Sequence, residues 1–216
     1  MRRFTVGAML ALCVSCGQPP PQATDTTTSA TLQPINPARI DRAREHVPDG
    51  YEVAPFAGPA SPVVLWGMGD GASADPPQCL ALAAPAVDPA AVRGWSASGP
   101  GGIIYAVVAA SPARPEPGLA RDCGRWRIAS ARSSAAVTRV DAPAVAAADT
   151  NGMRTEARTV VEGGTETRTH ADTFVAYLDG YVSFVAVVTD PGATHPALTA
   201  AFAADLLTET VAALRG

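Results

Sequence analysis

The chain has 216 residues and a formal net charge of −4, with 16 arginines, no lysine and 20 acidic residues. An acidic chain is a poor match for the polyanionic backbone of nucleic acid, so we expect no nucleic-acid partner. The length suffices for one sizeable hydrophobic core, which makes a single domain the default expectation.

The N-terminus has the features of an export signal. After a basic start, the apolar run from Phe4 to Val14 is far shorter than the roughly 20 residues that span a membrane. Small residues then precede Cys16, a pattern that resembles the bacterial lipobox, in which the cysteine becomes the first residue and carries lipid. A cut before Cys13 would place the bulky Leu12 at the cleavage point, which favours Cys16. We predict a signal peptide over residues 1–15 and attachment of a fatty acyl group such as palmitate at Cys16.

The remaining cysteines indicate an oxidising compartment. Removal of residues 1–15 leaves Cys16 for the lipid and two others, Cys79 and Cys123. Because exported chains meet oxidising conditions, we expect a Cys79–Cys123 disulfide. After this removal no CxxC spacing remains, and no His or Cys cluster lies beside Cys79 or Cys123, so we expect no metal and no cofactor. Loss of the signal peptide also removes two arginines, so that the net charge becomes about −6.

A polar tether precedes the folded part. Residues 16–35 are rich in Pro, Thr, Gln and Ser and carry little apolar surface, which predicts a disordered segment. We expect one folded domain over residues 36–216. Asn36-Pro37 is a typical N-cap and first-turn pair, and it predicts a short helix to about His46. The buried stripe of that helix would comprise Ile40, Ala43 and Val47.

The middle of the chain predicts short elements separated by Gly and Pro. We expect a strand over 51–55, a loop over 67–71, a hairpin from 94–98 and 102–109, and a half-buried strand over 125–130. Two helices would begin at Ser61-Pro62 and Asp75-Pro76. Asp75 would cap the second of these helices, which carries Cys79.

The C-terminal third carries the clearest pattern. Strands are expected over 153–162, 167–178 and 181–190, with turns at Gly163-Gly164 and Asp179-Gly180. A closing amphipathic helix follows. Its apolar positions are Leu198, Phe202, Leu206, Val211 and Leu214. The predicted fold is therefore α+β, an antiparallel sheet flanked by helices as a sandwich, with the C-terminal helix packed on the sheet.

No set of residues stands out as catalytic. The best candidates are His170 and Asp172, which would share one face of a strand, with Glu166 nearby. The same pattern is typical of a solvated sheet surface. We therefore expect no catalytic residues and no enzymatic activity, with a secreted hydrolase built on His170 and Asp172 as the alternative.

The three tryptophans admit two interpretations. The favoured one places Trp66, Trp95 and Trp126 in the core. In the functional alternative they line an aromatic pocket, with Arg93, Arg125 or Arg127 as an anchor for an anion. The candidate ligand-binding residues are then Trp66, Trp95, Arg125 and Trp126.

A family resemblance rests on several of these features together. Over roughly residues 35–216 the chain resembles uncharacterised mycobacterial secreted lipoproteins. The features that carry the resemblance are the lipobox, the tether, the Asn36-Pro37 helix, Gly50-Tyr51, the Cys123-Gly124-Arg125-Trp126 segment and the closing hairpin and helix. The abundance of Ala and the absence of Lys fit the high-GC genome of an actinobacterium. The chain is more loosely similar to the extracellular sensor domain of PknH-type serine/threonine kinases, for which two disulfides are expected where only one pair is available here. The resemblance implies a sheet flanked by helices, a cleft and a ligand-binding role, and it carries over no catalytic residues.

These observations predict a cell-envelope lipoprotein with a ligand-binding or sensor-type domain. It would be exported and held by lipid on the outer face of the cell membrane. Its partners would be that membrane and an unknown small-molecule, lipid or envelope-protein ligand. A structural or adhesive surface lipoprotein without a ligand is a further alternative.

Overall fold

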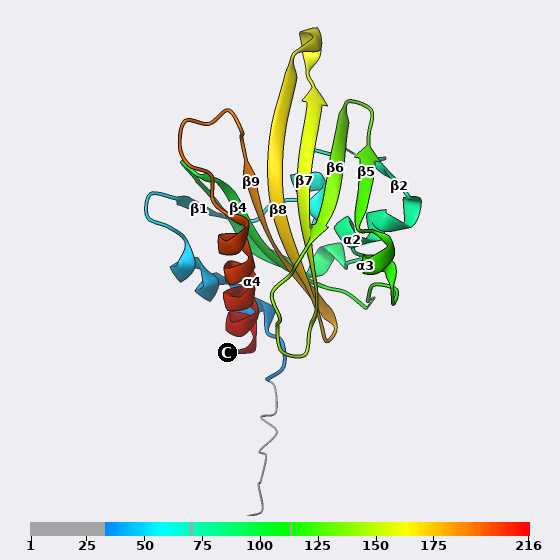
Figure 1. Ribbon diagram of the computed structural model, residues 1–216. Helices are drawn as coiled ribbons and strands as arrows, with labels where there is room; N and C mark the ends of the chain where they lie inside the picture. The colour runs from blue at the N-terminus through cyan, green and yellow to red at the C-terminus, as the bar shows by residue number, and fades with distance from the viewer. Residues whose placement is uncertain (1–32, 70, 113) are drawn as a thin grey trace, which may run out of the picture. The chain divides into compact units, whose positions relative to one another are not determined.

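Runs of Ala and β-branched residues build one antiparallel sheet of nine strands in the computed structural model, which describes residues 33–216 except 70 and 113 (Figure 1). The predicted signal peptide, Cys16 and the tether up to residue 32 lie outside the described residues. The strands are β1 (Glu52–Pro55), β2 (Ser73–Asp75), β3 (Val92–Gly99), β4 (Gly102–Ala110), β5 (Arg125–Ala129), β6 (Ser133–Val140), β7 (Asp149–Val160), β8 (Glu166–Leu178) and β9 (Tyr181–Thr189). Their order is β1-β3-β4-β9-β8-β7-β6-β5-β2.

Two groups of helices cover the two faces of this sheet. The helices are η1 (Pro37–His46), α1 (Pro62–Leu65), η2 (Pro77–Cys79), α2 (Leu80–Ala83), η3 (Pro89–Ala91), α3 (Leu119–Asp122), η4 (Glu162–Gly164) and α4 (Ala200–Arg215). Helices η1 and α4 pack on one face, and α4 contacts β8 and β9 (Figure 1). The short helices α1, α2 and α3 contribute to the core on the opposite face. The predicted α+β class, with the C-terminal helix packed on an antiparallel sheet, is confirmed.

The core under α4 is built from apolar stripes on both partners. Leu206, Val211 and Leu214 recur on one side of α4 and are buried against the sheet. Trp95 of β3 is fully buried there, and its Nε1 donates a hydrogen bond to the carbonyl of Ile40 in η1 at 3.1 Å. This bond satisfies the indole donor and fixes η1 against β3.

The core on the opposite face is organised by two tryptophans and a disulfide. Trp66 donates from Nε1 to Oγ1 of Thr173 in β8 at 3.0 Å, and Trp126 of β5 lies in the same cluster. Cys79 and Cys123 are joined by the expected disulfide, which links η2 to the chain just before β5. The bridge therefore connects the small helices of this face to the sheet that they cover.

The sequence predictions for local structure hold at most elements and differ from the structure at three places. Leu198 was expected on the closing helix but precedes it, because Thr199 caps α4 and the helix begins at Ala200. Asp75 does not cap a helix, because it is the last residue of β2 and pairs with Arg127 at the sheet edge. The helical segment that carries Cys79 begins two residues later, at Pro77. Strand β6 has no counterpart among the predicted strands, because its outward positions are small residues that give little alternation of polarity.

Removal of the disulfide should destabilise the domain measurably. The bridge closes a 44-residue separation, and in a chain-entropy account its loss costs about 2–5 kcal/mol of unfolding free energy. We expect a Cys79→Ala, Cys123→Ala variant to unfold at clearly lower denaturant concentration than the parent. The parent should also show no reactive thiol from either residue. Equal unfolding midpoints for the variant and the oxidised parent would contradict this role.

Candidate functional site

Part of the sheet face that carries α4 is open to solvent. Side chains alternate between faces along each strand. On β8, Phe174 packs under α4, so the residues spaced by two before it lie on the same face but beyond the helix. The registers of β5 to β8 place the following outward residues there: Arg125, Arg127, Ala129, Ser134, Ala136, Thr138, Arg154, Glu156, Arg158, Glu166, Arg168, His170 and Asp172. We call this surface the open face.

A groove runs along β6 within the open face. Strand β6 contributes only the small side chains of Ser134, Ala136 and Thr138 on this side, whereas β5 and β7 contribute long ones. Two adjoining depressions of about 430 and 270 Å³ follow from this difference in size. We call them together the β6 groove. Its lining comprises Arg125, Arg127, Ser134, Ala136, Thr138, Arg154, Glu156 and Arg158.

The arginines of the groove differ in their partners. On β7, Nε of Arg154 donates to Oδ1 of Asp172 at 3.0 Å, and Arg158 forms an ion pair with Glu166. Within the described part of the chain, the side chains of Arg125 and Arg127 on β5 form no hydrogen bond or ion pair. These two guanidinium groups therefore keep all their donors available to a ligand.

The side chain of Arg127 lines the groove although a carboxylate lies on the neighbouring strand. Its strand register places it directly opposite Asp75 of β2. No ion pair joins the two side chains, and Arg127 instead lines the depression beside Ser134 and Ala136. The cation is thus presented to the groove.

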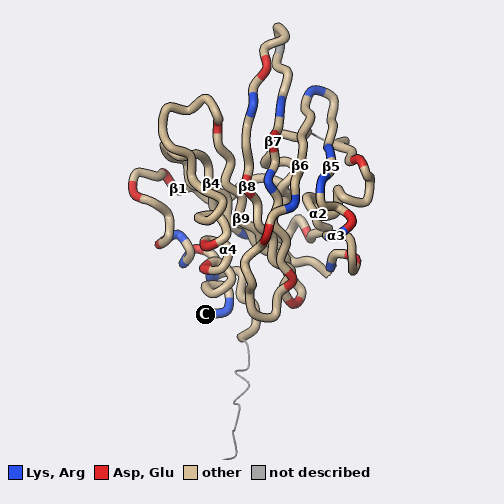
Figure 2. The backbone as a smooth tube through the Cα atoms, viewed as in Figure 1, with Lys and Arg blue, Asp and Glu red and all other residues tan. Residues whose placement is uncertain are grey.

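The open face is locally cationic in an acidic chain. It carries five arginines, namely Arg125, Arg127, Arg154, Arg158 and Arg168, against the carboxylates of Glu156, Glu166 and Asp172. The whole chain has more acidic than basic residues. Figure 2 shows basic positions gathered along β5, β7 and β8. Such a concentration attracts anions, more strongly at low ionic strength.

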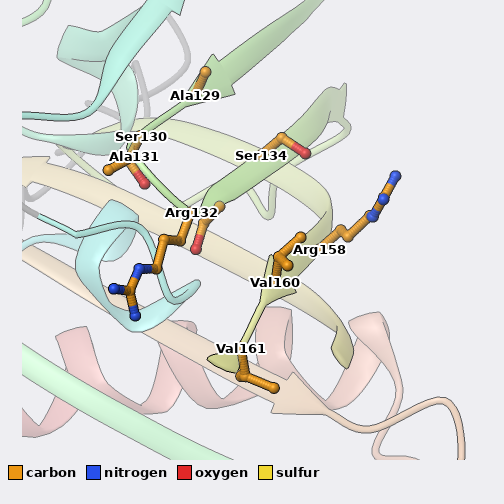
Figure 3. A pocket seen from close by; sticks show the side chains of 9 residues that line it. Ala129, Ser130, Ala131, Arg132, Ser134, Arg158, Val160 and Val161 are labelled. Carbon is orange, nitrogen blue, oxygen red and sulfur yellow. The ribbon is translucent and has the colours of Figure 1, made fainter. Parts of the chain in front are cut away.

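A larger depression of about 580 Å³ lies where the β5–β6 turn meets the end of β7. Its two arginine side chains do not point toward a common centre. Figure 3 shows the side chains of Arg132 and Arg158 pointing away from each other. The exposed Val160 and Val161 lie between them. The guanidinium groups of Arg125 and Arg127, which have no partner among the described residues, line the β6 groove instead.

A separate hollow of about 300 Å³ lies on the other side of the sheet, where β3, β4 and β9 are neighbours. It is formed by the turn at residues 99–102, the end of β9 and residues 193–197. The carboxylate of Asp190 accepts a hydrogen bond from the backbone of Gly192 at 2.7 Å, which leaves it a local structural role. His195 also lines this hollow, where its nearest polar neighbour is the hydroxyl of Thr194.

The residues of the predicted aromatic pocket are not brought together. Trp66 and Trp126 belong to the core under the short helices, whereas Trp95 lies in the core under η1 and α4. Arg125 points to the open face, next to but on the opposite side from Trp126. All three indoles are buried, and the sheet lies between Trp95 and the other two.

His170 and Asp172, the residues of the hydrolase alternative, lie on the open face, and in the described part of the chain neither forms a hydrogen bond with a Ser, Thr or Cys side chain. Asp172 is held by Arg154, and His170 is exposed opposite Glu156. In the described part of the chain the side chain of His170 has no hydrogen-bond partner. Among these residues no group of three or more His, Cys, Asp or Glu side chains is placed to hold a metal ion.

Sequence reasoning named Arg125 and Arg127 but missed the opposite wall of the groove. Arg154, Glu156 and Arg158 alternate along β7 with the inward Thr155 and Ala157, as Arg125 and Arg127 alternate along β5. This alternation of charged and buried residues along β7 was the sequence signal that could have identified the second wall. What the sequence could not supply was the order of strands, which inserts the small residues of β6 between the two charged rows.

Comparison with known proteins found a matching family model and solved structures of similar fold. A family model described as "Domain of unknown function (DUF5642)" matches residues 36–215. An uncharacterised protein from Mycobacterium smegmatis, an Rv0999 ortholog, has a similar X-ray structure with a TM-score of 0.60 at 19% identity, covering 84% of this chain and 98% of that one. No curated protein matches.

A second solved structure is less similar. The extracellular domain of PknH from Mycobacterium tuberculosis aligns with a TM-score of 0.46 at 13% identity, over 84% of this chain and 99% of that one. The resemblance to an uncharacterised mycobacterial family, with a looser likeness to the PknH domain, is confirmed. At 19% identity the similarity to the Rv0999 ortholog establishes a common fold.

The placement of the tryptophans can be checked by fluorescence quenching. The chain has three tryptophans, and their exposed fractions are 1% for Trp66, 0% for Trp95 and 2% for Trp126. We expect acrylamide and iodide to quench the native emission far less than the emission of the unfolded chain. An aromatic ligand pocket open to solvent would instead give a quenchable fraction in the native state.

Proposed function

The chain belongs to the DUF5642 family. We propose that it is a non-catalytic ligand-binding module of the cell envelope that recognises an anion. The observation that carries the proposal is the pair of unpartnered guanidinium groups, Arg125 and Arg127, that line the β6 groove. The envelope location follows from the lipobox at Cys16 and the polar tether after it.

The geometry of β5 suits an anion with several oxygens. Arg125 and Arg127 project from the same side of one strand, about 7 Å apart along it. Guanidinium groups bind carboxylate, sulfate and phosphate through two parallel N–H donors each. The small residues of β6 leave space beside them, so an anion can reach both groups without displacing a side chain.

The placement of His170 and Asp172 favours binding over hydrolysis. A hydrolase on this face would need a nucleophile in hydrogen-bond reach of His170 and a carboxylate that orients the ring. Asp172 is instead engaged by Arg154, and the side chain of His170 stands alone among the described residues. A groove that is open along its length also excludes little water from a reaction.

One further observation supports export. The buried Cys79–Cys123 disulfide is of the kind that persists in oxidising compartments. In the part of the chain that the structure describes, no helix is long and apolar enough to cross a membrane. In this proposal, lipid on Cys16 holds the module at the membrane.

Loss of the two free arginines should weaken anion binding. We expect an Arg125→Ala, Arg127→Ala variant to bind inorganic phosphate at least about 10-fold more weakly than the parent, because each charge-assisted hydrogen bond contributes about 1.5–3 kcal/mol before solvent screening. Titration calorimetry in low salt measures this change. Arg168→Ala and His170→Ala, on the same face outside the groove, are matched controls that should bind nearly as the parent does. Equal binding by the double variant and the parent would refute the assignment of the groove.

Membrane attachment should depend on Cys16. The apolar run before it is too short to span a bilayer and the segment after it is too polar to insert. We expect Cys16→Ser to release the protein from the membrane fraction and to abolish labelling by a fatty-acid analogue. If the Cys16→Ser protein were labelled as strongly as the parent, the lipid would have to sit elsewhere.

A further inference from the structure

We infer that the anion bound in the β6 groove carries hydroxyl groups, and that its class is the phosphorylated sugars and polyols. This inference rests on the proposed function, which uses the arginines of β5 on one wall of the groove. It adds the side chains of the opposite wall, formed by β7. The two walls differ, and the difference is what narrows the ligand class.

The wall formed by β7 offers an acceptor where the wall formed by β5 offers only donors. Glu156 lines both depressions of the groove, and its side chain is exposed. Among the described residues no side chain or backbone group donates to it. An ionised carboxylate accepts hydrogen bonds and donates none, so a ligand that uses Glu156 must bring a donor.

The floor of the groove adds two hydroxyl groups. Ser134 and Thr138 lie on the open side of β6, exposed and half-buried respectively, with Ala136 between them. The side chains of Ser134 and Thr138 have no hydrogen-bond partner within the described part of the chain. Each hydroxyl can donate to and accept from a ligand, which is the pairing that sugar and polyol hydroxyls make.

The donor that meets Glu156 should be a neutral hydroxyl and not an ammonium group. Arg154 and Arg158 flank Glu156 two residues away on the same face of β7, and Arg125 and Arg127 stand across the groove. A cationic ligand group beside Glu156 would face the guanidinium groups of Arg125 and Arg127, which have no carboxylate partner among the described residues, and like charges at such distances repel. Arg154 and Arg158 are already paired with Asp172 and Glu166. A hydroxyl avoids this repulsion and still donates to the carboxylate.

The width of the groove sets the size of the ligand. Strands β5 and β7 are separated by one strand, so their backbones lie about 9–10 Å apart. A single phosphate held by Arg125 and Arg127 does not extend across this width to Glu156. A phosphate attached to one sugar ring or a short polyol does extend across it, with its hydroxyls over Ser134 and Thr138.

The test compares four probes by titration calorimetry: glucose 6-phosphate, inorganic phosphate, glucose and phosphoethanolamine. We expect the parent to bind glucose 6-phosphate about 10-fold or more tightly than inorganic phosphate, as hydrogen bonds to a charged group would provide. Glu156→Ala should bring the affinities for glucose 6-phosphate and inorganic phosphate close to each other, because the acceptor for the sugar hydroxyl is gone. Glu156→Gln, which keeps an amide oxygen as acceptor, should retain part of the difference. Because Glu156 is exposed, the melting temperatures of both variants should match the parent.

The outcomes separate this inference from the function on which it rests. Equal affinities for glucose 6-phosphate and inorganic phosphate, both lost in the Arg125→Ala, Arg127→Ala variant, would overturn the hydroxylated ligand and leave the anion site intact. Tighter binding of phosphoethanolamine than of glucose 6-phosphate would also overturn it in favour of a zwitterion. If neither phosphate binds the parent, the anion site itself fails.

Discussion

The pairing of β7 with β8 along the whole length of β7 is the constraint on which the rest of the structure depends. Its register runs from Asp149 opposite Tyr177 to Val160 opposite Glu166. Because side chains alternate with a period of two, this one register decides the face of every residue on both strands. At one end it buries Phe174 under α4, and at the other it turns Arg154, Glu156 and Arg158 outward.

A sheet longer than its covering helices explains why core and site share one face. α4 packs on β8 and β9, and past this contact the strands continue with polar outward residues (Figure 1). The opposite face remains apolar further along, with Ala157 and Ala171 buried beneath the segment that carries Trp66. The domain therefore has one face that is buried along most of its length and one that is half core and half open to solvent. The disulfide belongs to the first face and leaves the second free of covalent restraint.

The sequence predicted the fold where local chemistry repeats, and it failed where the neighbours of a residue decide its role. The Asp179-Gly180 turn, the hairpin about Gly99-Pro100-Gly101 and the stripe of α4 are local signals, and each appears as expected. Asp75 looks like a helix cap in sequence but pairs at an edge formed by β5, which is distant in sequence. For the site, Arg125 and Arg127 were foreseen as anchors, whereas their supposed aromatic partners proved to be core. Their actual neighbours come from β6 and β7, and only the strand order brings them together.

The central claim is that the β6 groove is the binding surface of this domain, and amide chemical-shift mapping by NMR tests it most directly. On addition of glucose 6-phosphate, we expect the largest shifts at residues 125–129, 134–138 and 154–158, with small changes under α4 and around the disulfide. Shifts that instead cluster around residues 99–103 and 190–197, where the separate hollow lies, would contradict the account and move the binding site to the side of the sheet formed by β3, β4 and β9.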